Sequence, residues 1–189
     1  MDKDQERKCI ECVLGGDQGR YAELVDAYMR PLFRLACSMT GDRVAAEDLV
    51  QEAFFRAYTN LDHYDIERSF YSWLYAIALN AIRDWLRKRE TSVYAAGRAA
   101  SDCEPAELAS SEPGPEEQIA ARQREEATRR ALSLLSVEAR EILAMRFTAG
   151  LAFAEIGEIM GISADAAKTR TYRALEKLRA LLPADLSAP

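Results

Sequence analysis

The chain has 189 residues and a net charge of −6, with 49% hydrophobic and 30% charged residues. This length suits one large domain or two small ones, and no apolar run approaches the roughly 20 residues of a membrane span. The first dozen residues lack the apolar segment of a secretory signal, so we expect a cytoplasmic protein without direct membrane insertion. Few Gly and Pro residues beside abundant Ala, Leu, Glu and Arg favour an all-α fold.

Residues 1–19 form a polar lead segment that contains a CxxC motif, Cys9 and Cys12. Such a pair serves in redox proteins or supplies half of a zinc site. A zinc site needs further ligands at matching spacing, and His63 is the only histidine. We therefore interpret the two cysteines as incidental thiols of a reducing compartment, and we predict no metal and no cofactor.

The segment 20–90 is rich in helical periodicity, most clearly in "RVAAEDLVQEAFFRAY", residues 43–58. Its predicted core face consists of Ala46, Leu49, Val50, Ala53 and Ala57. A second stripe, which we expect on the surface, consists of Asp48, Glu52, Phe55 and Thr59, with Gln51 at its edge. An exposed phenylalanine among polar groups is typical of a protein interface. The alternative is that another helix of the same domain covers Phe55, and the spacing alone does not decide.

The next predicted helix, "SFYSWLYAIALNAIRDWLRKR", is apolar nearly all round and can be capped by Ser69. A narrow polar stripe remains, formed by Ser72, Ala76, Asn80, Arg83 and Arg87 and edged by Trp73. Cations interleaved with aromatic rings suit single-stranded nucleic acid, because phosphates follow the cations and unstacked bases stack on the rings. The alternative is that the aromatic residues only fill the core, which we expect of Trp85 and of at least one tyrosine.

Residues 91–118 have a different composition, with Pro105, Pro113 and Pro115, small residues and many carboxylates. Such a segment buries little apolar surface, so we predict a flexible acidic linker. Helical periodicity returns in residues 119–183, before a short tail at 184–189. The predicted architecture is therefore two small all-α domains joined by the linker.

The second block ends in a pattern typical of a helix-turn-helix. "FAEIGEIM" and "ADAAKTRTYRALEKLRALL" are separated by a turn in which Gly161 bends the chain and Ser163 can cap the last helix. The outward and flanking residues of that helix include Lys168, Thr169, Arg170, Tyr172 and Arg173. Cations beside hydroxyl groups and an aromatic ring can contact phosphates and base edges, which favours DNA binding over a merely solvated face.

These segments together resemble a known family. "AAEDLVQEAFFRAY", followed by "FYSWLYAIALNAIRDWLRKR", is similar to region 2 of extracytoplasmic-function (ECF) sigma factors, which belong to the sigma-70 family. "LSLLSVEAREILAMRFTAGLAFAEIGEIMGISADAAKTRTYRALEKL" is similar to their region 4. The resemblance covers nearly everything except the first dozen residues, the linker and the last few residues.

The resemblance implies a role for each surface in promoter recognition. In this family, region 2 docks on the β′ clamp helices of core RNA polymerase, and the matching residues are Asp48, Gln51, Glu52 and Phe55. The end of region 2 reads and melts the −10 element, where the loop from Tyr64 to Ser69 would take a flipped base. Its matching residues are Tyr64, Ser69, Trp73, Asn80, Arg83 and Arg87.

Region 4 of the family reads the −35 element, which the resemblance assigns to Lys168, Thr169, Arg170, Tyr172 and Arg173. The implied partners are the β flap of the polymerase, promoter DNA in double- and single-stranded form, and an anti-sigma factor. Carboxylates of the linker suit its path through polymerase channels that otherwise hold nucleic acid; they include Glu104, Glu107, Glu112, Glu116 and Glu117.

The sequence departs from the family pattern in two places. The recognition helix begins Asp165-Ala166-Ala167-Lys168-Thr169-Arg170 instead of the common Gly-Thr-Val-Lys/Arg-Ser-Arg, so the promoter sequence does not carry over. Gly157 stands where alanine is usual, a change that we expect to weaken its helix slightly.

Two other functions are consistent with parts of this pattern. A sigma mimic that titrates an anti-sigma factor would lack the basic groups of the last helix, which are present. An ordinary helix-turn-helix regulator would not need the stripe from Asp48 to Phe55. Nothing resembles a nucleophile with its base or a phosphate-binding glycine loop, so we predict no catalytic residues and no enzyme activity.

Overall fold

The computed structural model of the protein describes residues 1–92 and 115–183. Every regular element in these ranges is a helix, which confirms the all-α prediction. The described residues form two compact units, one on each side of residues 93–114. Within the described ranges, no helix combines the length and the apolar character needed to cross a bilayer.

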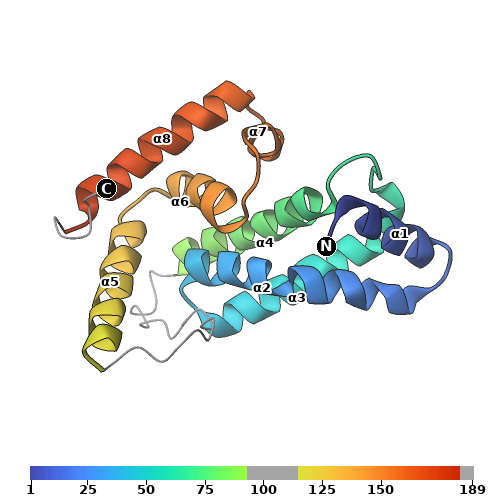
Figure 1. The fold of residues 1–189 in the computed structure, drawn as a ribbon, viewed down its shortest axis with the longest axis horizontal. Coiled ribbons are helices and arrows are strands. Elements are labelled where there is room, and N and C mark those ends of the chain that lie inside the picture. Colours follow the sequence, from blue (N-terminus) through green and yellow to red (C-terminus); the bar gives the residue numbers. More distant parts are fainter. Residues whose placement is uncertain (93–114, 184–189) are drawn as a thin grey trace. The chain divides into compact units, whose positions relative to one another are not determined.

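The first unit is a helical bundle (Figure 1). Its elements are α1 (Lys3–Leu14), η1 (Gln18–Arg20), α2 (Tyr21–Thr40), α3 (Arg43–Thr59), η2 (Leu61–His63) and α4 (Phe70–Ser92). The sharp turn between α2 and α3 follows from two adjacent residues. Gly41 takes the left-handed conformation, with φ 64°, that ends α2. Asp42 then caps α3 by accepting a hydrogen bond from the backbone N–H of Ala45.

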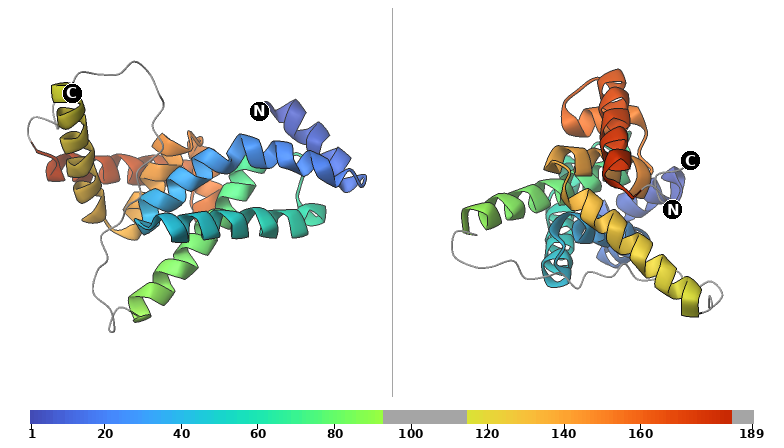
Figure 2. Two further views of the ribbon diagram at one scale, coloured as in Figure 1. Left: turned by 90° about the horizontal axis from the view of Figure 1, so that it is seen from below. Right: turned by 90° about the vertical axis from the view of Figure 1, so that its left-hand side faces the viewer.

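Helices α2, α3 and α4 bury the apolar faces predicted from their periodicity. α2 and α3 run side by side, and α4 crosses them (Figure 2). The core includes the fully buried Leu24, Leu32, Leu35, Ala46, Ala53, Phe70, Leu74, Tyr75 and Leu79. The buried Tyr75 confirms the prediction that at least one tyrosine of this helix belongs to the core. The prediction for Trp85 is wrong: its ring is only half-buried, and the guanidinium of Arg89 lies over it, 4.8 Å from the ring centroid.

The lead segment contains a helix that the sequence analysis did not predict. α1 begins with a capping box, in which Asp2 accepts from the backbone N–H of Gln5 and the Gln5 side chain accepts from the backbone N–H of Asp2. It buries Cys9, Ile10 and Val13 against the unit, together with the carboxylate-bearing Glu6. Only one face of α1 is apolar and half of its residues are charged, which is why composition alone concealed the helix.

The second unit contains α5 (Pro115–Ser133), α6 (Val137–Leu143), a π-helical turn η3 (Ala144–Thr148), α7 (Phe153–Met160) and α8 (Ala164–Leu181). α6 and α7 both pack against α8 (Figure 1). Ser136 caps α6 and Ser163 caps α8. Each serine hydroxyl accepts a hydrogen bond from the backbone N–H of the residue three positions later in the chain. The cap at Ser163 confirms the sequence prediction.

The predicted linker lies mainly outside the described residues. This holds for residues 93–114, including Glu104, Glu107 and Glu112, and also for the tail at 184–189. At its edges the structure differs from the prediction, because residues 91–92 end α4 and residues 115–118 begin α5. Pro115 occupies the first helical position, where a missing N–H removes no helical hydrogen bond. A proline that suggested a linker therefore starts a helix.

Gly157 has a stronger structural reason than the sequence indicated. A Cβ atom at this position would lie 2.7 Å from the carbonyl oxygen of Ile162, closer than van der Waals contact allows. The turn after α7 folds back over its last turn, where Gly161 has φ 66° and the N–H of Ile162 donates to the carbonyl of Gly157. The sequence predicted only that glycine weakens this helix slightly, whereas the structure shows that the turn needs the space beside Gly157.

Candidate protein and nucleic-acid interfaces

The stripe on α3 is exposed. Asp48, Gln51, Glu52 and Phe55 all face solvent, while Leu49 and Ala53 on the opposite face are buried. The Phe55 side chain keeps 68% of its surface exposed, so no described helix of its unit covers it. Glu52 is held along the helix by Arg56 at 2.6 Å. This surface thus combines one large apolar ring with carboxylate and amide groups.

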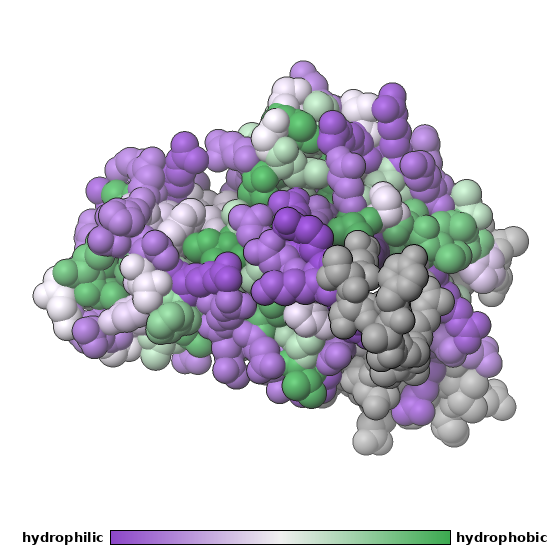
Figure 3. Space-filling view, turned by 180° about the vertical axis from the view of Figure 1, so that it is seen from behind, coloured by the Kyte–Doolittle hydropathy of each residue, from purple (hydrophilic) through white to green (hydrophobic). Residues whose placement is uncertain are grey.

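Hydrophobic residues on the surface occur in separate groups. Figure 3 shows one face on which hydrophilic residues predominate and hydrophobic ones form small patches. The large hydrophobic side chains exposed in the described part of the chain are Met1, Leu14, Val44, Phe55, Leu134, Phe147, Tyr172 and Leu181. Phe55 and Tyr172 are the members of this set that belong to surfaces predicted from the sequence. An exposed aromatic ring in such a setting is a good anchor for a partner.

The loop from Tyr64 to Ser69 is held by an aromatic cluster. The Tyr64 ring lies 5.0 Å from Trp73 and 5.6 Å from Phe70, measured between ring centroids. Its hydroxyl donates to the carbonyl of Arg68 at 2.6 Å. Burial, followed by the charges of Glu6 and Asp65, raises the pKa of Tyr64, so the phenol remains a donor across the physiological range. Ser69 caps α4 by accepting from the N–H of Ser72.

The polar stripe of α4 continues from this cluster along the helix. Asn80 and Arg87 are exposed, and Arg83 is half-buried with its guanidinium donating to the Asn80 amide oxygen at 3.3 Å. Arg87 forms an ion pair with Asp84 at 2.7 Å. With a rise of 1.5 Å per residue, Trp73 and Arg87 stand about 21 Å apart along the axis. The structure therefore divides the predicted set into an aromatic end and a cationic end.

The recognition helix α8 presents the predicted residues outward. Lys168, Thr169, Tyr172 and Arg173 are exposed, while Ala167, Thr171 and Ala174 are buried against α6 and α7. The buried Thr171 hydroxyl donates to the carbonyl of Ala167 at 2.8 Å, which satisfies it within the helix. The outward face inferred from the sequence is confirmed as exposed.

Arg170 has an internal partner that the sequence did not reveal. It forms an ion pair with Glu138 on α6, although the two residues are 32 positions apart. A cavity of about 240 Å³ lies between α6 and α8, and its charged lining residues are Glu138, Arg170, Arg173 and Lys177. No helical spacing signals a pair this distant, whereas the Arg87–Asp84 pair could have been found from its spacing of three residues.

The two N-terminal cysteines lie on α1 in different environments. Cys9 is buried and its thiol lies 3.0 Å from the carbonyl oxygen of Arg20, whereas Cys12 is exposed. Burial raises the pKa of Cys9 and favours the neutral thiol over the thiolate that binds metals. Among the described residues, no group of three His, Cys, Asp or Glu side chains is arranged to hold a metal ion. His63 is an exposed residue of η2.

Both units match known sequence families. Residues 24–91 match Sigma-70 region 2, and residues 131–180 match Sigma-70, region 4. The ECF RNA polymerase sigma factor SigW of Bacillus subtilis (strain 168) is 33% identical over 176 residues, which cover 92% of this chain and 94% of SigW. The chain belongs to the ECF sigma factors of the sigma-70 family. Sigma factors are transcription initiation factors that act with RNA polymerase on DNA.

Solved structures of other sigma factors have a similar fold. CnrH, in a complex with the cytosolic domain of CnrY, matches this sigma factor with a TM-score of 0.71 and 26% identity, over 94% of this chain and 96% of CnrH. RpoE from Bartonella quintana, in a complex with the anti-sigma factor NepR, matches with a TM-score of 0.68 and 23% identity, over 85% and 95% of the two chains. The likeness to RpoE concerns the fold.

Proposed function

We propose that this sigma factor binds core RNA polymerase, recognises the −10 and −35 promoter elements and promotes melting of the duplex for initiation. Residues 20–90 would act as region 2, residues 119–183 as region 4, and residues 91–118 as the acidic linker between them. The observation that carries the proposal is the exposed Phe55 in a polar stripe of α3, inside the segment that matches region 2. A protein that only binds DNA has no use for such a surface.

The α3 stripe is the proposed contact with the β′ clamp helices. Asp48 and Glu52 offer charges to a basic partner, Gln51 adds an amide, and Phe55 supplies the apolar anchor. All four side chains are exposed already, so binding requires no rearrangement of the bundle. The β flap is the corresponding proposed partner of region 4.

The loop and α4 form the proposed −10 surface. Tyr64 and Trp73 offer half-buried rings on which an unstacked base can stack, and Ser69 lies at the end of the same loop. Asn80, Arg83 and Arg87 continue the surface with groups that can follow the phosphates of one strand. Rings that accept unstacked bases, on the same surface as cations that can follow the phosphates, favour the separated strand over the duplex, which supports a role in melting.

The outward face of α8 is the proposed −35 reader. Thr169, Tyr172 and Arg173 point away from the unit, so they can reach base edges in a major groove. Lys168 and Arg170 flank this face and are suited to phosphates. When this sigma factor binds DNA, Arg170 must give up its ion pair with Glu138 to contact a phosphate.

We further infer regulation by an anti-sigma factor. The support is that RpoE was solved in a complex with an anti-sigma factor and CnrH in a complex with the cytosolic domain of CnrY. The exposed surfaces on α3 and α8 are the ones such a partner would have to cover to prevent both polymerase and DNA binding.

Transcription with purified components tests the proposal. The sigma factor is added to core RNA polymerase with a library of duplex promoters, and transcript starts are mapped. We expect a defined set of start sites preceded by a shared pair of elements. Arg83→Ala with Arg87→Ala should abolish initiation on duplex templates and leave it intact on templates opened in advance around the start site. An absence of sequence-specific initiation would contradict the proposal.

A further inference from the structure

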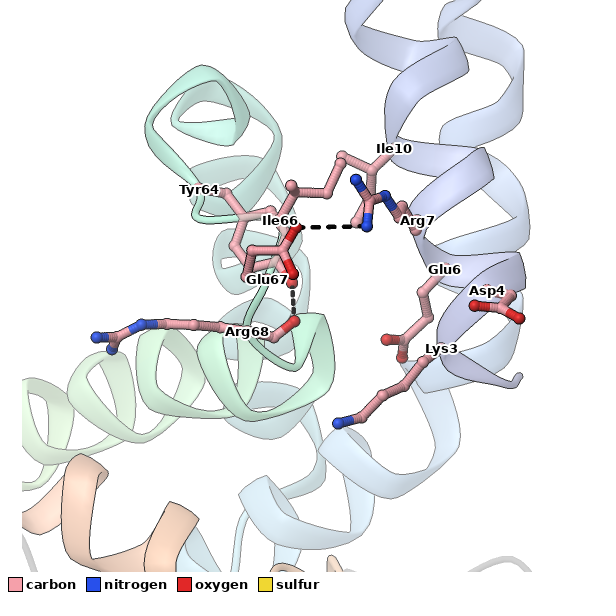
Figure 4. Close-up of a pocket in the computed structure, with 9 residues that line it drawn as sticks. All are labelled: Lys3, Asp4, Glu6, Arg7, Ile10, Tyr64, Ile66, Glu67 and Arg68. Atoms are coloured by element: carbon pink, nitrogen blue, oxygen red, sulfur yellow. Dashed lines mark hydrogen bonds and ion pairs between the residues drawn. The ribbon is translucent and has the colours of Figure 1, made fainter.

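A cavity separates α1 from the loop of the proposed −10 surface. Its volume is about 170 Å³, and its walls include Arg7 and Ile10 from α1 with Tyr64, Ile66 and Glu67 from the loop. Figure 4 shows Arg7 reaching from α1 toward the loop across this space. The sequence resemblance covers the loop but gives no function to α1. The two elements nevertheless contact each other at specific side chains.

An ion pair joins α1 directly to the loop. Arg7 Nη1 lies 3.3 Å from Glu67 Oε1, as the dashed line in Figure 4 marks. The Nε atom of Arg7 is held at 3.2 Å by Glu11, one turn further along α1. The contact with Glu11 thus fixes the orientation of the Arg7 guanidinium that pairs with Glu67. Because both side chains are largely exposed, this ion pair adds little to the free energy of unfolding. Its main effect is to fix the position of the loop relative to α1.

A second connection runs through the interior. Glu6 is 7% exposed and accepts a hydrogen bond from the Tyr28 hydroxyl on α2. The Tyr28 ring is stacked on Tyr71, 5.0 Å away at 21°, and lies 6.2 Å from Phe70. Burial, with this hydrogen bond as the next cause, raises the pKa of Tyr28 and keeps it a donor. A buried carboxylate needs such a partner, so α1 can dock only where Tyr28 meets it.

The aromatic contacts extend from Tyr28 to the proposed DNA surface. The Phe70 ring, which is fully buried, lies 5.6 Å from Tyr64 and 5.8 Å from Trp73. Glu6 therefore connects to Tyr64 and Trp73 through Tyr28 and one intervening ring. A closely packed chain of this kind transmits a displacement at one end to the other.

We propose that α1 is a positioning element of the −10 surface, in which Glu6 and Arg7 hold the Tyr64–Ser69 loop and Trp73 in the arrangement that receives DNA. This inference rests on the proposed function of the loop. A loop held in place before binding loses less conformational entropy when a nucleotide enters it, so its affinity is higher. Glu6 and Arg7 are positioning residues, since neither has to touch the DNA.

The first test needs no polymerase and no promoter. Trp85→Phe leaves Trp73 as the only tryptophan, because the chain has two. In this background Glu6→Ala should shift the Trp73 emission to longer wavelength and increase its quenching by iodide, as the ring loses cover. Glu6→Gln keeps an acceptor for Tyr28 and should leave the emission close to that of the parent. Lys8→Ala, an exposed substitution on the same helix, is the matched control.

The second test measures binding with the full chain assembled on core polymerase. The probe is a single-stranded oligonucleotide that carries the −10 element found by transcript mapping. Glu6→Ala should weaken this binding about tenfold, the factor of one charge-assisted hydrogen bond, with unchanged affinity for core polymerase and for a −35 duplex. Arg7→Glu should weaken it by a smaller factor, and Arg7→Glu combined with Glu67→Arg should recover most of the loss.

The outcomes separate the two proposals. Unchanged Trp73 emission and unchanged −10 binding in Glu6→Ala would overturn the role of α1. Equal losses of −10, −35 and core binding would also overturn it, because they indicate a merely structural helix. Should Glu6→Ala fail to fold, the charge exchange between Arg7 and Glu67 decides. A double variant that does not recover −10 binding would then contradict the inference. If the wild-type protein selects no promoter, the proposed function fails while the emission test still reports on α1.

Discussion

The proposed −35 and −10 surfaces are constructed in different ways. The −35 surface lies on a single helix, α8, whose outward residues Thr169, Tyr172 and Arg173 are exposed and whose inward residues pack on α6 and α7. The −10 surface is composite, because Tyr64 comes from a loop and Trp73 from α4, and the two rings meet around the buried Phe70. We infer that substitutions of the outward residues of α8 act on binding alone, whereas those near Tyr64 act on folding and binding together. The α3 stripe resembles α8 in this respect.

The largest effect is expected at the centre of the composite surface. Phe70→Ala removes a fully buried ring that contacts Tyr28, Tyr64 and Trp73. It should lower the free energy of unfolding of the first unit by about 3–5 kcal/mol and weaken −10 binding at the same time. Chemical denaturation of the full chain, followed by circular dichroism, measures the first quantity. Phe147→Ala, at a ring that is 63% exposed, is the control. A Phe70→Ala variant of normal stability would contradict the inference that folding and binding are coupled at the composite −10 surface.

A single-helix surface should lose binding without losing stability. Phe55→Ala removes an exposed ring from α3 and should reduce the affinity for core polymerase by about 2 kcal/mol or more, because the ring is the proposed anchor. Its thermal unfolding should stay close to that of the parent, because no described helix packs on Phe55. Binding to immobilised core polymerase and a melting curve measure the two quantities. Val44→Ala, at another exposed apolar side chain of α3, should leave both quantities nearly unchanged.

The next effect concerns the turn that supports α8. Gly157→Ala gains about 1 kcal/mol of helix propensity, but its Cβ would lie 2.7 Å from the carbonyl oxygen of Ile162. Because a backbone atom must move, we expect a net destabilisation of the second unit by about 1–3 kcal/mol. Thermal unfolding and binding to a −35 duplex should decline together. A stabilised variant would mean that propensity outweighs the contact and that the turn can shift.

The smallest effect should come from the ion pair behind α8. Glu138→Gln releases Arg170 and removes a negative charge near the DNA phosphates, so the affinity for a −35 duplex should rise by about 0.5–1 kcal/mol. The slope of log affinity against log salt should steepen by about one, since one more cation becomes available. Fluorescence anisotropy over a series of salt concentrations measures both.

A matched control exists on α5. Glu126→Gln breaks an exposed ion pair with Arg130 on that helix and should change neither the affinity nor the slope. A fall in affinity for Glu138→Gln would show that Glu138 orients Arg170 for DNA and does not compete with it.

Most of the predicted site residues have the exposure that the sequence indicated. Helical periodicity alone placed Leu49 and Ala53 on a different face of α3 from Phe55, and it placed Tyr172 on the outward face of α8. It failed for α1, where a short apolar face is surrounded by charged residues, and for Trp85, which lies near the end of α4 under Arg89. In both cases the position of a neighbouring element decides burial, and periodicity carries no information about neighbours.

The sequence by itself determined which residues share a helix face, because a repeat of 3.6 residues per turn follows from backbone geometry. Its two long motifs also determined membership of the ECF sigma factors. Only the tertiary structure decided that Glu138 pairs with Arg170, that Glu6 is buried against Tyr28, and that a side chain at Gly157 would meet the carbonyl oxygen of Ile162. Each of these depends on how separate segments approach one another, and such an approach is set by packing of the whole unit. That packing is also what connects α1 to the loop of the proposed −10 surface.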